Sequence, residues 1–106
     1  MTDLSDKIKK VLLNRNVEWQ RHALERMAER DIARDDVFRV LLTGECIEDY
    51  PETKPFPSFL FLGEINARPL HVVAACDVLE ERLFIITAYE PDLQHFKPGF
   101  KTRRKP

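Results

Sequence analysis

The hydrophobic pattern of this chain changes from a helical period to an extended one at Gly44. Before Gly44, apolar residues recur every three or four positions, and after it short apolar segments are separated by turn residues. Helices first and strands second is the order of an α+β fold. Because the connections are short, we expect N-terminal helices packed on a four-stranded antiparallel sheet.

Helical spacing predicts three helices in the first 43 residues. The first carries apolar residues at Leu4, Ile8, Val11 and Leu12. The second runs from about Glu18 to Arg30, and the third from Arg34 to Thr43 with Gly44 as its stop. Ala33, at the start of the third helix, is a poor N-cap.

Four strands are expected after Gly44, at Glu45–Tyr50, Phe59–Ile65, Leu70–Asp77 and Arg82–Tyr89. The last two are apolar on both faces, which is typical of strands in the middle of a sheet. The segment Asn66–Pro69 between the second and third strands is expected to form a turn.

Length and composition exclude several classes of protein. The 106 residues allow a single domain, 1–106, with 43% hydrophobic and 33% charged residues, which is a globular composition. No apolar run approaches the ~20 residues of a membrane helix, and no basic start precedes an apolar stretch, so we expect neither membrane insertion nor a signal peptide. Cys46 and Cys76 are too few for a disulfide framework, and we expect a reduced, cytoplasmic protein. A homodimer is also plausible, because small domains bury little surface alone.

The charge is uneven although the net charge is only −1. The basic tail, residues 97–106, holds five basic residues and no acid, and the remainder of the chain is acidic. Such a tail either contacts phosphate groups or is a solvated terminus, and the charge pattern leaves both open.

Residues suited to catalysis are scattered along the chain. Only three glycines are present, which excludes the glycine-rich phosphate loops, and the three histidines are far apart, so no metal and no cofactor is expected. His22 and Arg26, spaced i,i+4, share one polar helix face, where an imidazole moves protons and a guanidinium holds phosphate; an ordinary surface pair is the alternative. His71, inside an apolar strand, is a candidate catalyst or a hydrogen-bonded core histidine.

Several stretches together resemble a known family: His22–Arg30, Arg68–Val73, Ile85–Asp92 and the closing Phe100–Arg104. They resemble the small bacterial family called domain of unknown function 4258, over residues 18–104. Asp31 and Ala67 stand where that family usually has glycine, so both positions require an unusual backbone or a different turn.

The resemblance implies a function. The family is similar to the RelE/MqsR-like toxin superfamily, in which helices pack on an antiparallel sheet, and its members are often found beside zinc-finger antitoxins of the MqsA/YgiT type. It therefore implies an mRNA-cleaving toxin of a toxin–antitoxin pair, with RNA and such an antitoxin as partners.

Under this hypothesis the protein is a metal-independent endoribonuclease, in which a ribose 2′-hydroxyl attacks the neighbouring phosphate. We expect His71 or His22 as base or acid, Arg26 and Arg68 as phosphate ligands, and Tyr89 as a hydrogen-bond donor. The basic tail would clamp the RNA backbone through Lys101, Arg103 and Arg104.

The alternative is a non-catalytic protein-binding or dimerisation module. The acidic excess of residues 45–96, where the strands are expected, favours it, because a groove for single-stranded RNA is normally lined by basic residues. Phe56, Phe59 and Phe61 would then form an exposed patch for a protein partner, with sheet core as the competing interpretation.

Overall fold

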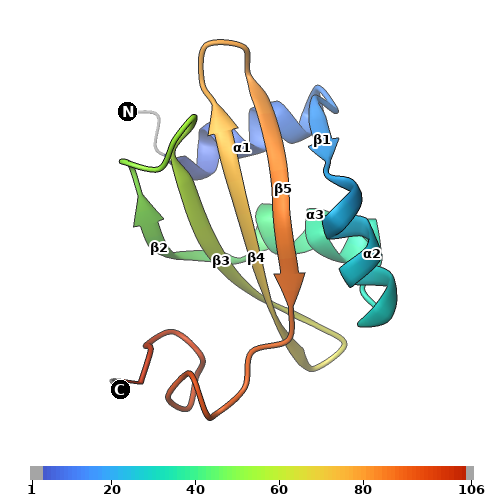
Figure 1. Ribbon diagram of the computed structural model, residues 1–106, viewed down its shortest axis with the longest axis vertical. Coiled ribbons are helices and arrows are strands. Elements are labelled where there is room, and N and C mark those ends of the chain that lie inside the picture. Colours follow the sequence, from blue (N-terminus) through green and yellow to red (C-terminus); the bar gives the residue numbers. More distant parts are fainter. Residues whose placement is uncertain (1–3, 105–106) are drawn as a thin grey trace.

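Five strands form one mixed sheet in the order β1-β5-β4-β3-β2 (Figure 1). The computed structural model describes residues 4–104. Its elements, in chain order, are α1 (Leu4–Leu13), β1 (Val17–Trp19), α2 (Arg21–Glu29), α3 (Arg34–Thr43), β2 (Glu45–Tyr50), β3 (Ser58–Ile65), β4 (Arg68–Asp77) and β5 (Arg82–Tyr89). The α+β class is as expected, and β4 and β5 lie inside the sheet as their sequences indicate.

The prediction of a four-stranded, wholly antiparallel sheet is wrong, because β1 adds a fifth strand parallel to β5. Val17 pairs with Leu83 and Trp19 with Ile85, so the segment expected to begin the second helix is extended. The Trp19 ring packs edge-on against Phe38 of α3, 5.5 Å between centroids. Three residues are too few to show a period of their own, and their partner strand lies at the other end of the sequence.

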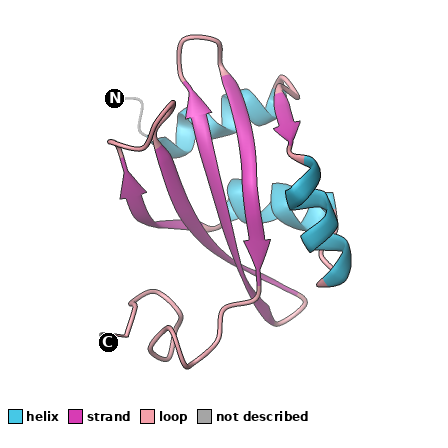
Figure 2. Ribbon diagram, viewed as in Figure 1, coloured by secondary structure: helices cyan, strands magenta, loops and turns pink. Residues whose placement is uncertain are grey.

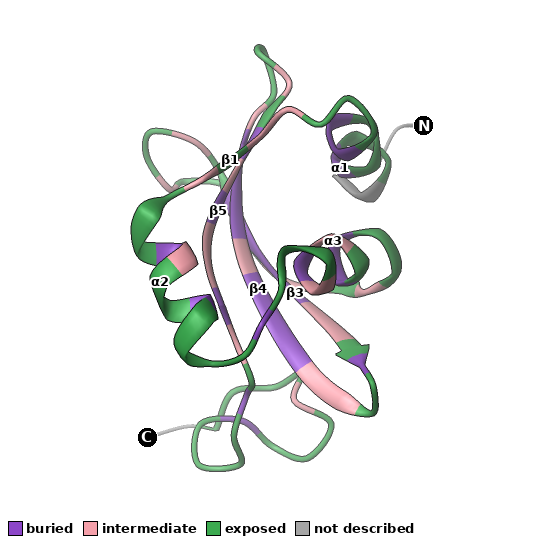
Figure 3. Ribbon diagram, turned by 90° about the vertical axis from the view of Figure 1, so that its right-hand side faces the viewer, coloured by how far each residue is buried: buried purple, intermediate pink, exposed green. Residues whose placement is uncertain are grey.

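Helices α1 and α3 cover one face of the sheet, and α2 packs beside β5 (Figure 3). Leu70, Val72 and Ala74 of β4 belong to the buried core beneath the helices. Because side chains alternate along a strand, His71 points to the opposite face. That face is the one reached by the C-terminal segment, residues 91–104, since the Phe100 carbonyl bonds the His71 ring.

The turn between β3 and β4 is shorter than expected. It comprises Asn66 and Ala67 alone, with φ of 52° and 63°, and Arg68 and Pro69 belong to β4. Pro69 pairs with Glu64 on one side, and the pairing with β5 starts only at His71, so its missing N–H breaks no ladder bond to β5.

The two positions where glycine was expected both have left-handed backbones, at Ala67 and at Asp31, whose φ is 57°. The unusual backbone predicted there is therefore confirmed. Arg68 stabilises the bend at Asp31 by donating to its carbonyl over 3.1 Å. At the start of α3, where Ala33 supplies no side-chain cap, the Asp36 carboxylate accepts the Ala33 N–H over 2.9 Å.

The C-terminal segment contains only turns and an isolated bridge (Figure 2). Its first turn closes with a hydrogen bond from the Phe96 N–H to the Asp92 carbonyl, 3.1 Å. The chain then doubles back so that Phe96 pairs with Arg103, and this compact loop lies at the end of β5 (Figure 1). Over residues 4–104, no helix has the length and apolar character needed to cross a membrane.

Candidate functional site

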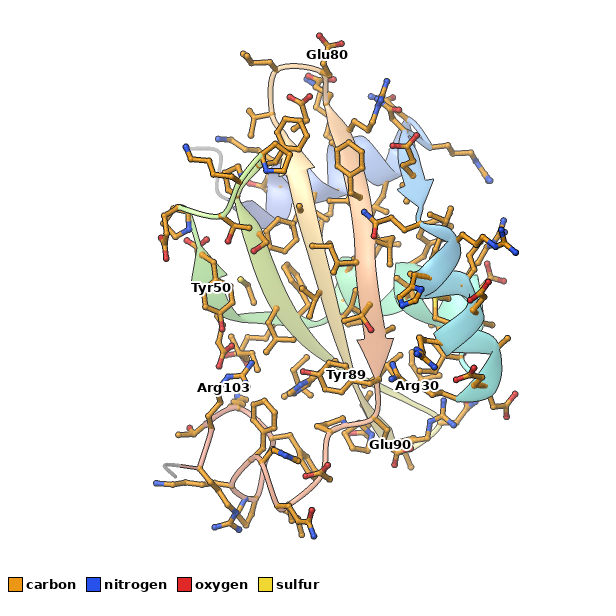
Figure 4. The ribbon with its side chains drawn as sticks, in the orientation of Figure 1. Arg30, Tyr50, Glu80, Tyr89, Glu90 and Arg103 are labelled. Carbon is orange, nitrogen blue, oxygen red and sulfur yellow. The ribbon has the colours of Figure 1, made fainter. Side chains whose placement is uncertain are left out.

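An open cleft of about 650 Å³ lies where β5 ends and the C-terminal segment begins. It is lined by Arg30, Tyr89, Glu90, Pro91, Asp92, His95, Phe96 and Arg103. Figure 4 shows Tyr89 between Arg103 and Arg30. The cleft thus combines two guanidinium groups, two carboxylates, a phenol and an imidazole, contributed by the end of α2, the end of β5 and the C-terminal segment.

Both arginines of the cleft are held by the protein. The Arg30 guanidinium follows α2 and donates to the Ala88 carbonyl over 2.9 Å, which directs it along the end of β5. The Arg103 guanidinium lies 4.9 Å from the centroid of the Phe96 ring and donates to both carboxylate oxygens of Glu48, over 2.8 and 3.0 Å. Guanidinium groups held in this way can bind an anionic group, here beside the carboxylates of Glu90 and Asp92.

His95 is paired with Asp92 inside the first turn of the C-terminal segment. Asp92 Oδ1 lies 2.8 Å from His95 Nδ1 and also accepts the backbone N–H of His95 over 2.9 Å. Hydrogen bonds from His95 hold the pKa of the Asp92 carboxyl below its ordinary value. Because Nδ1 is occupied by a carboxylate, Nε2 is the nitrogen that remains to exchange a proton with a ligand in the cleft.

His71 lies behind Tyr89 and has no exposed surface. Its Nδ1 is 3.2 Å from the Tyr89 hydroxyl, and its Nε2 is 2.9 Å from the Phe100 carbonyl oxygen. The Phe96 ring packs edge-on against the imidazole, 4.6 Å between centroids. Both nitrogens therefore have protein partners, so His71 orients Tyr89 and does not itself meet a ligand.

Glu48 connects Arg103 of the cleft to strand β2 at the edge of the sheet. It accepts hydrogen bonds from Arg103 and from the Tyr50 hydroxyl. Burial raises the pKa of the Glu48 carboxyl, but these two hydrogen bonds outweigh burial and the pKa is lowered. The carboxylate form is thereby maintained, and it balances the charge of Arg103 next to the cleft.

The structure brings His71, Tyr89 and Arg103 together but leaves the other predicted site residues apart. His22 and Arg26 are exposed on α2 and do not line the cleft, and Arg26 pairs with Glu29 over 3.1 Å. Arg68 does not line the cleft either: it donates to the Asp31 carbonyl and pairs over 3.6 Å with Glu90, which does line it.

The basic tail is largely bound to the protein itself. Lys101 pairs with Glu45 over 2.8 Å, Arg103 pairs with Glu48, and Arg104 donates to the Leu93 carbonyl. Lys105 lies outside the described residues. The uneven charge of the sequence is therefore partly internal, because tail cations neutralise acidic residues of β2.

The cleft residues that escaped the sequence analysis include Arg30, Asp92 and His95. Arg30 follows the last turn of α2, away from its periodic stripe. The signal that could have identified the other two is the spacing Asp-x-x-His directly after a strand, which suits an aspartate that caps a turn and reaches the histidine three residues later.

The remaining candidates have structural roles. Cys76 is buried and Cys46 is half-buried, and burial raises the pKa of both thiols, as expected for small hydrophobic residues. Phe59 and Phe61 are core residues, and Phe56 stacks on Phe84 with 5.3 Å between centroids. Within residues 4–104, no group of three or more His, Cys, Asp or Glu side chains is arranged to hold a metal ion.

Comparison with known proteins places the chain in a family. The model of the family described as "Domain of unknown function (DUF4258)" matches residues 19–90, about two thirds of the sequence. The chain belongs to the DUF4258 family. No curated protein and no solved structure matches it. The DUF4258 match includes Arg30 and Tyr89 but ends at residue 90, before Asp92, His95 and Arg103, whereas the sequence resemblance was expected to reach Arg104.

Proposed function

We propose that this DUF4258 protein is a metal-independent endoribonuclease that acts as the toxin of a toxin–antitoxin pair. The observation that carries the proposal is the cleft in which an Asp92-bound His95 faces the same space as Tyr89 and two held guanidinium groups. Helices packed on a sheet, together with the similarity to RelE/MqsR-like toxins that the resemblance to the DUF4258 family implies, support the toxin assignment.

Arg30 and Arg103 are the phosphate ligands in this proposal. Each guanidinium is held by a protein acceptor, the Ala88 carbonyl for Arg30 and the Glu48 carboxylate for Arg103. Groups that are already in place cost little reorganisation when negative charge develops on the phosphate. They replace Arg26 and Arg68, which the sequence analysis favoured and which do not line the cleft, although Arg68 pairs with Glu90 at its border.

His95 is the general base. Its Nε2 takes the proton of a ribose 2′-hydroxyl, the 2′ oxygen bonds to the adjacent phosphorus, and the bond from phosphorus to the 5′ oxygen breaks. The 5′ oxygen takes a proton from water, and His95 returns its own to solvent. The products are a 2′,3′-cyclic phosphate and a 5′-hydroxyl, with no water consumed overall.

The acidic sheet is compatible with a polyanionic substrate. Two acidic residues of β2, Glu45 and Glu48, are neutralised by Lys101 and Arg103 of the C-terminal segment.

The alternative of a protein-binding phenylalanine patch loses support, because Phe59 and Phe61 lie in the core.

The proposal is tested by incubating the purified protein with single-stranded RNA in excess chelator, with and without ribosomes, and identifying the ends of the fragments. We expect cyclic phosphate and 5′-hydroxyl ends, and a loss of at least about 100-fold in His95→Ala. His22→Ala is the matched control, an exposed histidine outside the cleft, and it should retain full activity. Intact RNA under both conditions, or equal cleavage by His95→Ala, would contradict the proposal.

The toxin role is tested separately in cells. Regulated expression should arrest growth, and co-expression of a neighbouring gene of the zinc-finger antitoxin type should relieve the arrest. RNA profiling during the arrest should map cleavages that are absent with His95→Ala. Unimpaired growth on expression of the stable wild-type protein would count against a toxin.

A further inference from the structure

We propose that Tyr89 recognises the ribose 2′-hydroxyl as a hydrogen-bond acceptor, and that His71 is the positioning residue that makes it one. The substrate class rests on the proposed function. The inference reverses the direction of the Tyr89 hydrogen bond expected from sequence, where the phenol was a donor to the substrate.

The direction follows from the two partners of His71. A carbonyl oxygen only accepts, so the nitrogen 2.9 Å from the Phe100 carbonyl, Nε2, carries a hydrogen. In a neutral imidazole the other nitrogen, Nδ1, then has no hydrogen and accepts. The group 3.2 Å from Nδ1 is the Tyr89 hydroxyl, which must therefore donate its only hydrogen to His71.

The neutral form of His71 is the one that its surroundings favour. The ring has no exposed surface, and burial lowers its pKa below the ordinary value of 6.5. The charged groups acting on it are Arg103, which lowers the pKa further, and Glu48, which raises it together with the Phe100 carbonyl. The phenol of Tyr89 completes the set, and burial raises its own pKa, so it remains protonated.

Tyr89 consequently has only its lone pairs to offer to the cleft. A hydroxyl oxygen has two, and the Arg103 guanidinium, which also acts on the Tyr89 hydroxyl, takes at most one. A phosphate oxygen has no hydrogen to give to the other lone pair. A ribose 2′-hydroxyl next to a phosphate held by the two arginines has one: it donates this hydrogen to Tyr89 in the bound state and turns it to His95 Nε2 when the proton is transferred. A deoxyribose has no such hydrogen. When a ligand lacks the 2′-hydroxyl, the half-buried Tyr89 oxygen is left without a hydrogen-bond partner, and this disfavours binding of that ligand.

The hydrogen-bond direction is measured first, without any ligand. In protein labelled with ¹⁵N-histidine, long-range ¹H–¹⁵N spectra at pH 7 should show His71 as the Nε2–H tautomer. Protonation of Nδ1, alone or together with Nε2, would overturn the inference, because Tyr89 would then be free to donate.

Ligand discrimination is measured by calorimetry with uridine 3′-monophosphate and its 2′-deoxy counterpart. The wild-type protein should bind the ribonucleotide about tenfold more tightly. Tyr89→Phe, which removes only the hydroxyl, should bind both alike, whereas the control His22→Ala should keep the preference. Equal binding by the wild type, no binding of either ligand, or a preference retained by Tyr89→Phe would each overturn the inference.

Failure of the inference is distinguishable from failure of the proposed function. Ribose preference without cleavage of RNA leaves the recognition by Tyr89 standing and removes the nuclease. Cleavage of RNA by a wild-type protein that binds both nucleotides alike removes the recognition and leaves the nuclease standing.

Discussion

The Glu48 carboxylate accepts two hydrogen bonds from the Arg103 guanidinium and so joins the edge strand β2 to the C-terminal segment. The carboxylate is largely buried, with 18% of the side chain exposed, whereas 54% of the Arg103 side chain is exposed. Two parallel bonds of this type fix orientation as well as distance. The pair therefore determines where one of the two cleft cations lies.

Replacing Glu48 by Gln should release the C-terminal segment from the sheet. We expect faster hydrogen exchange over residues 97–104 and a loss of about 1 kcal/mol in the free energy of unfolding. The native pKa of Glu48 is lowered from 4.5, so its stabilisation is full above that pH and is lost as the pH falls below it. Glu48→Gln should therefore weaken the dependence of the free energy of unfolding on pH in this acidic range. The same pH dependence in the variant and in the wild type would contradict the assignment.

Acidification should also destabilise the protein through His71. Its native pKa lies below the unfolded value of 6.5, so the unfolded state binds the proton more readily. The free energy of unfolding should be constant above about pH 6.5 with respect to this group and fall as the pH drops below it. Chemical denaturation between pH 5 and 8 measures the slope, which His71→Gln should remove and His22→Gln should not. Identical slopes in all three proteins would refute the explanation.

Ala67→Gly should stabilise the protein by about 1 kcal/mol. Ala67 has φ of 63°, a conformation that costs a side chain with a Cβ about 1–2 kcal/mol and glycine little. Ala28→Gly is the matched control, because Ala28 is exposed inside helix α2 and the same substitution there should cost about 1 kcal/mol. Shifts of the same sign in the two variants would contradict the left-handed turn.

Gly63→Ala should destabilise the protein by about 1–3 kcal/mol. A Cβ at Gly63 would lie 2.8 Å from Val40 Cγ2 and 3.1 Å from Val40 Cα, so α3 would have to move away from β3. The cost should be smaller in a Val40→Ala background, where the nearer atom is absent. If the losses of the two single variants add in the double variant, contact with the Val40 side chain is not the cause of the destabilisation.

The elements with their own periodic signal were predictable. Helix α3 has the predicted bounds, Arg34–Thr43, and so do β2 and β5. The strand Val17–Trp19 was missed because its conformation depends on a pairing with residues 83–85, which no local pattern contains.

The site was only partly predictable for a related reason. The composition of β4 and β5 pointed to His71 and Tyr89, but the pattern along a strand does not tell whether a histidine nitrogen meets solvent or a carbonyl. The polar face of α2 pointed to His22, although that face is turned to solvent rather than to the cleft. The course of the C-terminal segment, which carries His95 to the end of β5, follows from tertiary contacts.

The parallel pairing of β1 with β5 also bears on how fast the chain folds. Val17 can find Leu83 only after a loop spanning most of the polypeptide has closed, and loop closure of that length carries an entropic cost before any contact offsets it. Proteins dominated by such distant contacts have high contact order and fold slowly. We therefore expect the hairpin of β3 and β4, whose turn is two residues long, to form early, and the docking of β1 to complete the native state.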